Sequence, residues 1–384
     1  MRFLIAPDSF KNCLSAEEVC DAIAKGILKA APNSEIIKVP MADGGEGTTS
    51  VIAKALGADI IHCTVTGPLP KKVTAFYALD HSTAIIEVAQ ACGITYTTAK
   101  NRNPFLANSY GVGELINDAL DHGAKHFIIG LGGSATNDGG FGMAQALGVR
   151  FYDQNNTLLK PAVTALAALA RIDTSKLNPK LAQADFKLAC DVTSPLTGHK
   201  GASFVFGPQK GAQPDDLPKL DALLKHYGTL VAPELMSCPG AGAAGGLGFA
   251  MMAFLKAKRT SGAVLVADTV SLFQKAQKCD VVFTGEGSTD FQTAFGKTPM
   301  VTVQIAKKAS PNCLAIGLSG HLGDDLTLLY EKGFDAFFSI VNGPQTLDEA
   351  LLKGADNLTQ TAENITRLIL SQQSKYFKKG QNQV

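Results

Sequence analysis

Apolar and polar residues at the start of the chain alternate in the manner of a parallel α/β protein. Residues 2–7 (RFLIAP) form a short apolar run that predicts a strand. The next segment repeats its apolar residues at helical spacing, and Ser15 with Glu18 forms a capping box before it. A second strand over 34–40 and a second helix over 48–57 complete a β-α-β-α pattern. Such a series is typical of a parallel sheet.

The middle of the chain has a different pattern of apolar and polar residues. Residues 59–67 and 83–89 alternate apolar and polar positions, which is typical of antiparallel strands. Residues 111–123 have helical spacing, and the apolar run that follows them predicts a buried strand ending at Gly130. Residues 149–159 predict a hairpin with an Asn-Asn turn. This region therefore mixes strands and helices without strict alternation.

Strand and helix patterns alternate again from about residue 264. Residues 268–278 predict one helix, and a long final helix follows residue 346. Because predicted strands and helices alternate at both ends of the chain, we predict a Rossmann-like parallel α/β domain built from residues 1–66 and 264–384. Residues 67–263 are predicted to form an inserted, mixed α/β domain. A length of 384 residues also exceeds what one compact core usually holds.

Composition narrows the class of protein. The chain is 46% hydrophobic and 18% charged, with a formal net charge of +1 and no basic stripe, so we expect no nucleic-acid partner. Its eight cysteines form no C-x-x-C motif, which is typical of reduced intracellular thiols. The longest uncharged stretch near a helix, residues 239–255, is too short to span a bilayer. We expect a cytoplasmic protein with no membrane partner.

Loops rich in glycine and polar residues follow most of the predicted strands. The segment GLGGSATNDGGFGM (130–143) contains six glycines and a single charge between a strand and a helix. α/β proteins hold anions at such junctions. The candidate binding residues in these loops are Asp8, Ser9, Lys11, Asp43, Gly44, Gly45, Glu46, Gly132, Gly133, Ser134, Thr136, Asn137, Asp138, Asp191, Lys210, Gly285, Glu286, Asp290, Gln292 and Lys297.

These residue types suit phosphoryl transfer. Glycine lets backbone N–H groups approach phosphate oxygens, carboxylates hold Mg²⁺, and lysines neutralise the transferred group. Loops at the carboxyl ends of parallel strands meet, so we expect an active site in a cleft between the domains. Each residue alone also has a simpler interpretation. Asp8 or Asp43 could cap a helix, Asp191 could form an Asx-turn, and Lys210 could lie on the surface.

Two segments resemble nucleotide-binding motifs without matching them fully. GAGAAGG (240–246) fits G-x-G-x-x-G, but no predicted strand precedes it. An NAD-dependent hydroxy-acid oxidoreductase that uses this loop is our alternative function. FGKT (295–298) ends like a P-loop, but Phe291 stands where that motif requires glycine. A kinase built from this chain would therefore not be a P-loop kinase.

Seven blocks together resemble one known family. They are APDSFKNCLSA, PMADGGEGT, GLGGSATNDGGFGM, ACDVTSPLTG, FGPQKGA, PGAGAAGGLG and TGEGSTDFQTAFGKTP. The blocks occur in this order in the glycerate kinase type I family, over residues 1 to about 370. The resemblance implies a kinase that uses ATP with Mg²⁺ and phosphorylates D-glycerate. The usual product is 2-phosphoglycerate, in the catabolism of glyoxylate or sugar acids.

The resemblance also suggests roles for residues. We predict Asp191 as the base, with Asp290 second and Asp138 third, and the first two also as Mg²⁺ ligands, directly or through water. Lys11, Lys210 and Lys297 are the candidate cations, and Lys11 and Lys210 are counted with the catalytic residues. Many members of the family carry arginine where this chain has Ser288, so another cation must supply that contact here.

Some questions stay open at this point. The acceptor could be the 2- or the 3-hydroxyl of glycerate. The oligomeric state is not determined, and a homodimer is one arrangement that the sequence allows. A non-catalytic sugar-acid sensor on the same fold is a third possible function.

Overall fold

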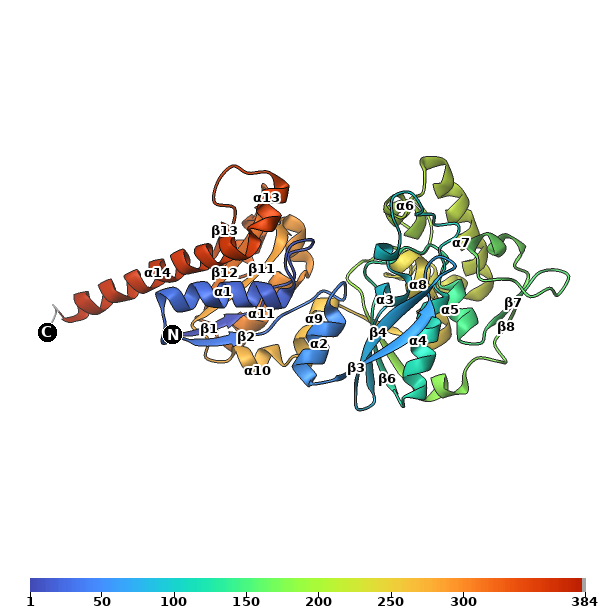
Figure 1. Cartoon of the computed structure of the whole chain (residues 1–384), viewed down its shortest axis with the longest axis horizontal. Helices are drawn as coiled ribbons and strands as arrows, with labels where there is room; N and C mark the ends of the chain where they lie inside the picture. Colours follow the sequence, from blue (N-terminus) through green and yellow to red (C-terminus); the bar gives the residue numbers. More distant parts are fainter. Residues whose placement is uncertain (382–384) are drawn as a thin grey trace. The chain divides into compact units, whose positions relative to one another are not determined.

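The computed structural model describes residues 1–381, with side chains described up to residue 371. The chain forms two compact α/β units, which can be followed by colour in Figure 1. Unit 1 contains residues 1–43 and the chain from Ala263 onward, and unit 2 contains Gly44–Gly262. The mixed α/β class agrees with the prediction, and each unit has its own sheet and its own core.

Unit 1 contains a five-stranded sheet in which every neighbouring pair is parallel, in the order β13-β12-β11-β1-β2. The strands are β1 (Arg2–Ile5), β2 (Glu35–Lys38), β11 (Val281–Thr289), β12 (Leu314–Leu322) and β13 (Ala336–Ser339). β1 connects toward β2, and β11 connects the other way toward β12. The topological switch point of the sheet therefore lies between β1 and β11, where such folds bind ligands.

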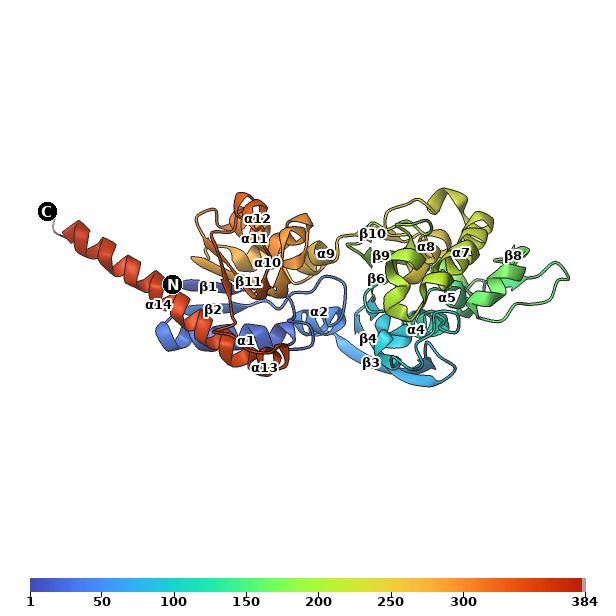
Figure 2. The same cartoon turned by 90° about the horizontal axis from the view of Figure 1, so that it is seen from above.

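Helices cover both faces of this sheet. In Figure 2, α1 and α14 lie on one face of the sheet, and α10 and α11 lie on the other. The bounds are α1 (Ala16–Ala30), α9 (Gly262–Thr269), α10 (Leu272–Ala276), α11 (Thr298–Ala309), α12 (Thr327–Glu331), α13 (Leu347–Leu352) and α14 (Gly354–Gln381). α1 begins at the predicted capping box, in which Ser15 and Glu18 bond each other's backbone N–H. Its apolar side packs on the sheet and on α14, where Gly26 lets the backbone of Thr359 approach closely.

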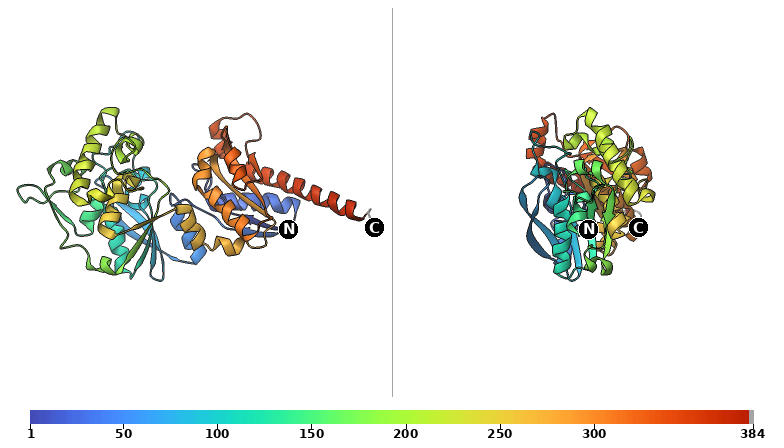
Figure 3. Two further views of the ribbon diagram at one scale, coloured as in Figure 1. Left: turned by 180° about the vertical axis from the view of Figure 1, so that it is seen from behind. Right: turned by 90° about the vertical axis from the view of Figure 1, so that its right-hand side faces the viewer.

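Unit 2 contains a six-stranded mixed sheet in the order β10-β9-β6-β5-β4-β3, which Figure 3 shows from behind. The strands are β3 (Asp59–Thr66), β4 (Lys72–Asp80), β5 (Thr83–Glu87), β6 (His126–Gly130), β9 (Asp185–Ala189) and β10 (Lys258–Thr260). β4 is antiparallel to both of its neighbours, and the four strands from β5 to β10 are parallel. The carboxyl ends of β5, β6 and β9 consequently lie at one edge.

The helices of unit 2 enclose two apolar cores around this sheet. Their bounds are α2 (Thr48–Leu56), α3 (Ala89–Cys92), α4 (Tyr110–Asp121), α5 (Phe141–Ala146), α6 (Ala202–Phe206), α7 (Leu217–Val231) and α8 (Ala243–Leu255). Phe127 and Phe186 stack across adjacent strands with their ring centroids 4.6 Å apart. Phe141 and Phe151 pack with Tyr227 in the second core.

The first domain boundary differs from the prediction. It falls after Asp43 and not near residue 66, because β3 pairs with β4 along its whole length and so belongs to the sheet of unit 2. The backbone N–H of Thr49 in α2 also bonds to Glu87 of that unit. The second boundary lies after Gly262, beside the predicted 264.

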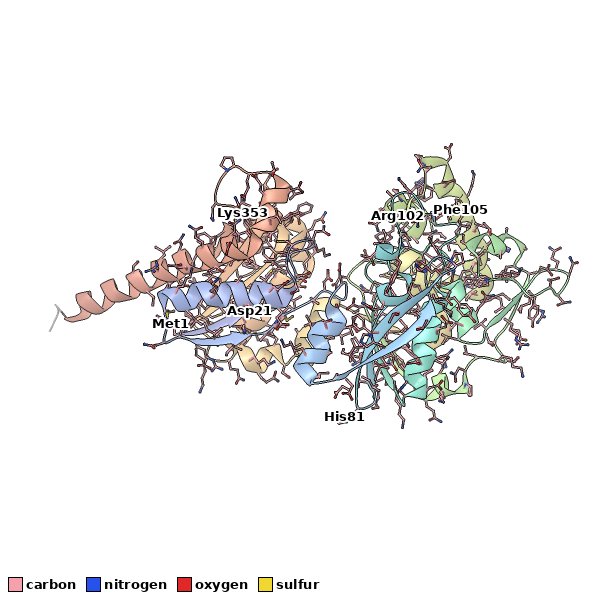
Figure 4. All side chains as sticks on the ribbon, in the orientation of Figure 1. Met1, Asp21, His81, Arg102, Phe105 and Lys353 are labelled. Carbon is pink, nitrogen blue, oxygen red and sulfur yellow. The ribbon has the colours of Figure 1, made fainter. Side chains whose placement is uncertain are left out.

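Three predicted elements also differ. The helix predicted over 268–278 is interrupted at Ser271, whose φ of 56° is left-handed, so α9 and α10 are separate. The final helix is divided at Lys353, which Figure 4 labels, between α13 and α14. The Asn-Asn turn closes only a single bridge from Tyr152 to Leu158. The strand partner of β7 (Arg150–Tyr152) is β8 (Arg171–Asp173).

Candidate active site

Polar side chains gather at the switch point of the unit 1 sheet. Backbone pairing between the two central strands continues past β1, since Asp8 donates its N–H to the carbonyl oxygen of Gly285 over 2.9 Å. Asp8 is thereby held beside Glu286. We call Asp8, Lys11, Asp43, Glu286 and Lys297 the switch-point cluster. Asp8 and Lys11 follow β1, Asp43 follows β2, and β11 contains Glu286 and precedes Lys297. The carboxyl ends of these three strands share this edge of the sheet.

Asp8 is the most buried carboxylate of this cluster. One carboxylate oxygen accepts the N–H of Ser9 over 2.6 Å, and the other accepts the hydroxyl of Thr298 over 2.9 Å. Burial, followed by the negative charge of Asp43, raises the pKa of Asp8 to about 7. Lys11 lies 3.9 Å from Asp43 and compensates part of this charge. Asp8 and the carboxylate of Asp43, whose charge opposes the ionisation of Asp8, form a donor set suited to a hard cation.

Lys297 joins the remaining acids of unit 1. Its ammonium lies 3.5 Å from Glu286 and 3.6 Å from Asp290. Thr293 donates its hydroxyl to Glu286 over 2.6 Å, and burial raises the pKa of that carboxyl. Asp290 caps the short helix η7 (Phe291–Phe295) by accepting the N–H of Gln292, whose own side chain is exposed. The cluster is therefore charged, hydrogen-bonded and partly accessible.

Glycines in two predicted loops of unit 2 pack against each other and against the end of β9. Glu87, Gly130 and Ala189 end β5, β6 and β9 in register. A Cβ atom on Gly132 would lie 2.6 Å from the Cα of Gly45, and one on Gly44 would lie 2.7 Å from the Cβ of Ala189. Close backbone packing therefore explains these glycines. Gly133 has a φ of 70°, a conformation that glycine adopts without strain.

Glu87 is a residue that the sequence analysis missed. Its buried carboxylate accepts the N–H of Thr49 over 2.6 Å and that of Gly47 over 3.4 Å. Burial raises its pKa. We predicted that backbone N–H groups of the glycine-rich loops approach phosphate oxygens, but Glu87 accepts two of the N–H groups at the start of α2. Glu46 in the same loop is exposed. A carboxylate at the end of an apolar strand (TAIIE) was the only available signal.

Asp138, predicted as a binding residue and third candidate base, instead holds the surrounding backbone in place. It is fully buried, and its carboxylate accepts four hydrogen bonds from Ser109, Gly140 and Gly142 at 2.8–3.2 Å. These bonds fix the starts of α4 and α5, so its oxygens are not available to act as a base. Asn137 is also fully buried, and its amide donates to the hydroxyl of Ser203 over 2.9 Å.

Lys210 lies in the interior, against the simpler interpretation of a surface lysine. Its ammonium donates to the hydroxyl of Ser134 over 3.0 Å and to the carbonyl oxygen of Thr136 over 2.7 Å. The residue is 2% exposed, and burial lowers its pKa to about 8. Arg102, labelled in Figure 4, donates to the carbonyl oxygen of Gln209 over 3.0 Å and holds this segment in place. We call Lys210 with Ser134 and Thr136 the Lys210 cluster.

Asp191 is exposed at the end of β9 and accepts the N–H of Gly262 over 3.0 Å. It belongs to unit 2, whereas Asp290 belongs to unit 1, so neither unit by itself brings the two predicted metal ligands together. Among residues 1–371, whose side chains the structure describes, no three His, Cys, Asp or Glu side chains are arranged to hold a metal ion. Mg²⁺ requires only one or two protein ligands, so Asp8 and Asp43 fit it better than that pair.

The GAGAAGG loop packs inside unit 2. It follows the short helix η6 (Pro233–Leu235) and not a strand. Gly245 and Gly246 are left-handed, and their backbones lie against Thr136 and Gly139. This packing explains the glycines without a dinucleotide, so the oxidoreductase alternative has no support. The Ser288 hydroxyl bonds to Nδ1 of His321 over 3.2 Å, which places an imidazole ring beside the position of the missing arginine.

Comparison with known proteins shows the class and the family. A model of the glycerate kinase family matches residues 3–370. The chain is 44% identical to the glycerate 2-kinase of Escherichia coli K12, over 95% of this chain and 97% of that one. It is 43% identical to a glycerate kinase of Bacillus cereus, over 98% and 100% of the two chains. A crystal structure assigned as glycerate kinase 2 from Salmonella typhimurium LT2 superposes with a TM-score of 0.85 at 42% identity, over 97% and 99%.

The fold, the polar strand ends and these matches together define a kinase. Its two α/β units carry the hydroxyls, lysines and carboxylates from which a phosphotransferase site is built. The chain belongs to the glycerate kinase family. In the part of the chain that the structure describes, no helix is both long enough and apolar enough to cross a membrane.

Proposed function

We propose that this protein transfers the terminal phosphoryl group of ATP to D-glycerate and forms 2-phosphoglycerate. The observation that carries the proposal is the 44% identity, over nearly the full length, to a relative named glycerate 2-kinase. The two clusters supply cations for anionic oxygens and carboxylates for a metal, and the exposed Asp191 supplies a carboxylate for the proton. The catabolism of glyoxylate or sugar acids is the proposed context.

In unit 1, Asp8 and Asp43 are the proposed Mg²⁺ ligands, directly or through water. Bound Mg²⁺ would neutralise charge on the phosphates of ATP. Lys11 lies beside Asp43 and Lys297 lies beside Glu286, and both lysines are proposed to contact phosphate oxygens. The hydroxyl of Thr298 orients Asp8, and that of Thr293 orients Glu286. These hydrogen bonds prearrange the carboxylates before any ligand arrives.

In unit 2, Lys210 is the proposed anion-binding group. The Lys210 ammonium donates to a hydroxyl and a carbonyl oxygen, neither of which carries a charge, so a ligand carboxylate or phosphate would compensate its charge. Asp191 remains the proposed base, because it is an exposed carboxylate at the carboxyl end of β9. Asp290 is the second candidate. The proposed compartment is the cytoplasm, since all eight cysteines are free thiols.

The first experiment is a coupled assay of ADP release with ATP, Mg²⁺ and D-glycerate. We expect ADP release that depends on glycerate, with no nicotinamide signal. ³¹P NMR of the product then separates the hydroxyls. A phosphate on the 2-hydroxyl couples to one carbon-bound proton and appears as a doublet, whereas one on the 3-hydroxyl appears as a triplet. Folded protein that binds glycerate but releases no ADP would instead be a sensor, and the proposed function would be wrong.

A further inference from the structure

Two cysteine thiols meet at the edge of the unit 1 sheet that is opposite the switch-point cluster. Cys279 precedes β11 and Cys313 precedes β12, and these neighbouring parallel strands pair Val281 with Leu314. The thiols therefore lie at the amino ends of the strands, away from Asp8 and Glu286. The two residues are 5% and 2% exposed.

The two thiols line the same cavity at the ends of neighbouring strands. Cys313 stabilises the Cys279 thiolate and so lowers the pKa of Cys279, while Cys279 raises the pKa of Cys313. The hydroxyl of Ser310 donates to the carbonyl oxygen of Ala276 over 3.0 Å and also helps to lower the pKa of Cys279. A left-handed turn at Lys278, with a φ of 60°, sets the direction in which Cys279 leaves α10. Cys279 therefore has two neighbouring groups that favour its thiolate, the Cys313 thiol and the Ser310 hydroxyl.

These contacts give the two thiols different roles. Donors around its sulfur lower the pKa of Cys279, because they stabilise the thiolate. The neighbouring sulfur and burial raise the pKa of Cys313. One reactive thiolate beside one protonated thiol is the arrangement found in cysteine pairs that are oxidised and then resolved.

A cavity connects this pair to small molecules. Its volume is about 650 Å³, and its lining includes both cysteines, Lys278, Asp280, Asn312 and Met1, the last of which is labelled in Figure 4. Neutral peroxide is far smaller than this cavity. Burial raises the pKa of Cys20, Cys92 and Cys190 in contrast, and the described contacts of these thiols include no second sulfur.

We propose that Cys279 and Cys313 form a reactive dithiol that hydrogen peroxide oxidises to an intramolecular disulfide. The Cys279 thiolate attacks a peroxide oxygen, the O–O bond breaks, and the leaving hydroxide takes a proton to become water. The Cys313 sulfur then attacks the Cys279 sulfenic acid. An S–S bond forms, the S–O bond breaks, and a second water leaves. The two thiols lose two electrons and two protons, and one peroxide becomes two waters.

The test uses the full-length, pre-reduced protein without any kinase substrate. The protein is treated with hydrogen peroxide, unfolded, alkylated and digested. The masses of its peptides are then measured by mass spectrometry. We expect the Cys279 and Cys313 peptides as one cross-linked pair, lighter by two hydrogens and restored by a dithiol reductant. Cys13 and Cys238 are more exposed than this pair. If they are oxidised first, or if Cys279 links to another partner, the proposal is wrong.

Two variants at one position separate the roles. Cys313→Ser keeps an O–H donor beside Cys279 but cannot resolve it, so a sulfenic acid should accumulate at Cys279 and react with dimedone. Cys313→Ala removes the donor, and alkylation of Cys279 at pH 7 should become about tenfold slower than in Cys313→Ser. Equal rates in the two variants would show that the sulfur contact does not activate Cys279. Cys238→Ser is the control and should oxidise like the wild type.

Discussion

The hydroxyl of Thr298 donates a hydrogen bond to the carboxylate of Asp8 over 2.9 Å, across 290 positions of sequence. It connects the first residue of α11 to the loop after β1. The hydroxyl, the N–H of Ser9 and the charge of Lys11 all favour ionised Asp8. Burial and Asp43 oppose it more strongly, so the carboxyl is held near its titration point at neutral pH. A cation bound beside it would shift that balance toward the carboxylate.

Asp8→Asn should stabilise the protein at alkaline pH and abolish its activity. The pKa of Asp8 is 3.8 in the unfolded chain and about 7 in the folded one, so the folded state binds the extra proton between these values. Wild-type stability therefore falls as pH rises from about 4 to 7, and the variant avoids this loss. We expect a gain of about 2 kcal/mol above pH 7 and none near pH 4, from denaturant titrations. Asp43→Asn is the matched variant and should move the midpoint of the wild-type loss to lower pH. A gain that does not depend on pH would contradict the assignment.

Lys210→Met should lower activity without unfolding the protein. Removing the proposed anion-binding group should reduce kcat/KM by about 100-fold or more. Burial lowers the pKa of Lys210 from 10.5 to about 8, so its charge costs stability below pH 8. Because the folded state loses its proton before the unfolded state does, wild-type stability rises between pH 8 and 10. The variant should be about 1–3 kcal/mol more stable at pH 7, and the difference should shrink by pH 10. Lys225→Met, on an exposed lysine, serves as the control. Wild-type activity in the Lys210 variant would remove this residue from the site.

Glu87→Ala should loosen the start of α2. The change leaves the N–H groups of Thr49 and Gly47 without their acceptor, and we expect a loss of about 2–4 kcal/mol in the free energy of unfolding. Glu87→Gln keeps one acceptor oxygen and should cost about 1 kcal/mol. Hydrogen exchange at the Thr49 amide should quicken in both variants, and more in the alanine variant. If that amide stays protected in Glu87→Ala, then another group caps the helix.

Ser15→Ala should weaken α1 and leave catalysis unchanged. Ser15 accepts the N–H of Glu18 over 3.3 Å, and Glu18 accepts the N–H of Ser15 over 2.8 Å. Loss of this cap should cost about 1 kcal/mol, because one helix-start N–H loses its partner. Ser50→Ala, at an exposed position of α2, should change stability by less than about 0.5 kcal/mol. The specific activity of folded Ser15→Ala should match the wild type. A large fall would place α1 in the function of the site.

Local pattern alone predicted much of this protein. The cap at Ser15, the spacing of α1 and the parallel strands at both chain ends are decided by neighbours in sequence, and the structure confirms them. The seven ordered motifs indicated the family for the same reason, since each is a short continuous segment that remains recognisable without its partners. The family match over residues 3–370 confirms that resemblance.

Tertiary structure decided which polar residues are occupied by other protein groups. Nothing near Asp138 in the sequence shows that Ser109 reaches it, and nothing near Thr49 points to Glu87, 38 positions away. From the sequence alone Lys210 could be a surface lysine, but in the structure the loop from Ser134 to Thr136 encloses it. Burial and hydrogen-bond partners depend on segments brought together by packing, and these set the charge and availability of a side chain. The sequence by itself therefore determined the kind of fold and the family. Only the packed chain decided the charge of each polar side chain and whether it is available to a ligand.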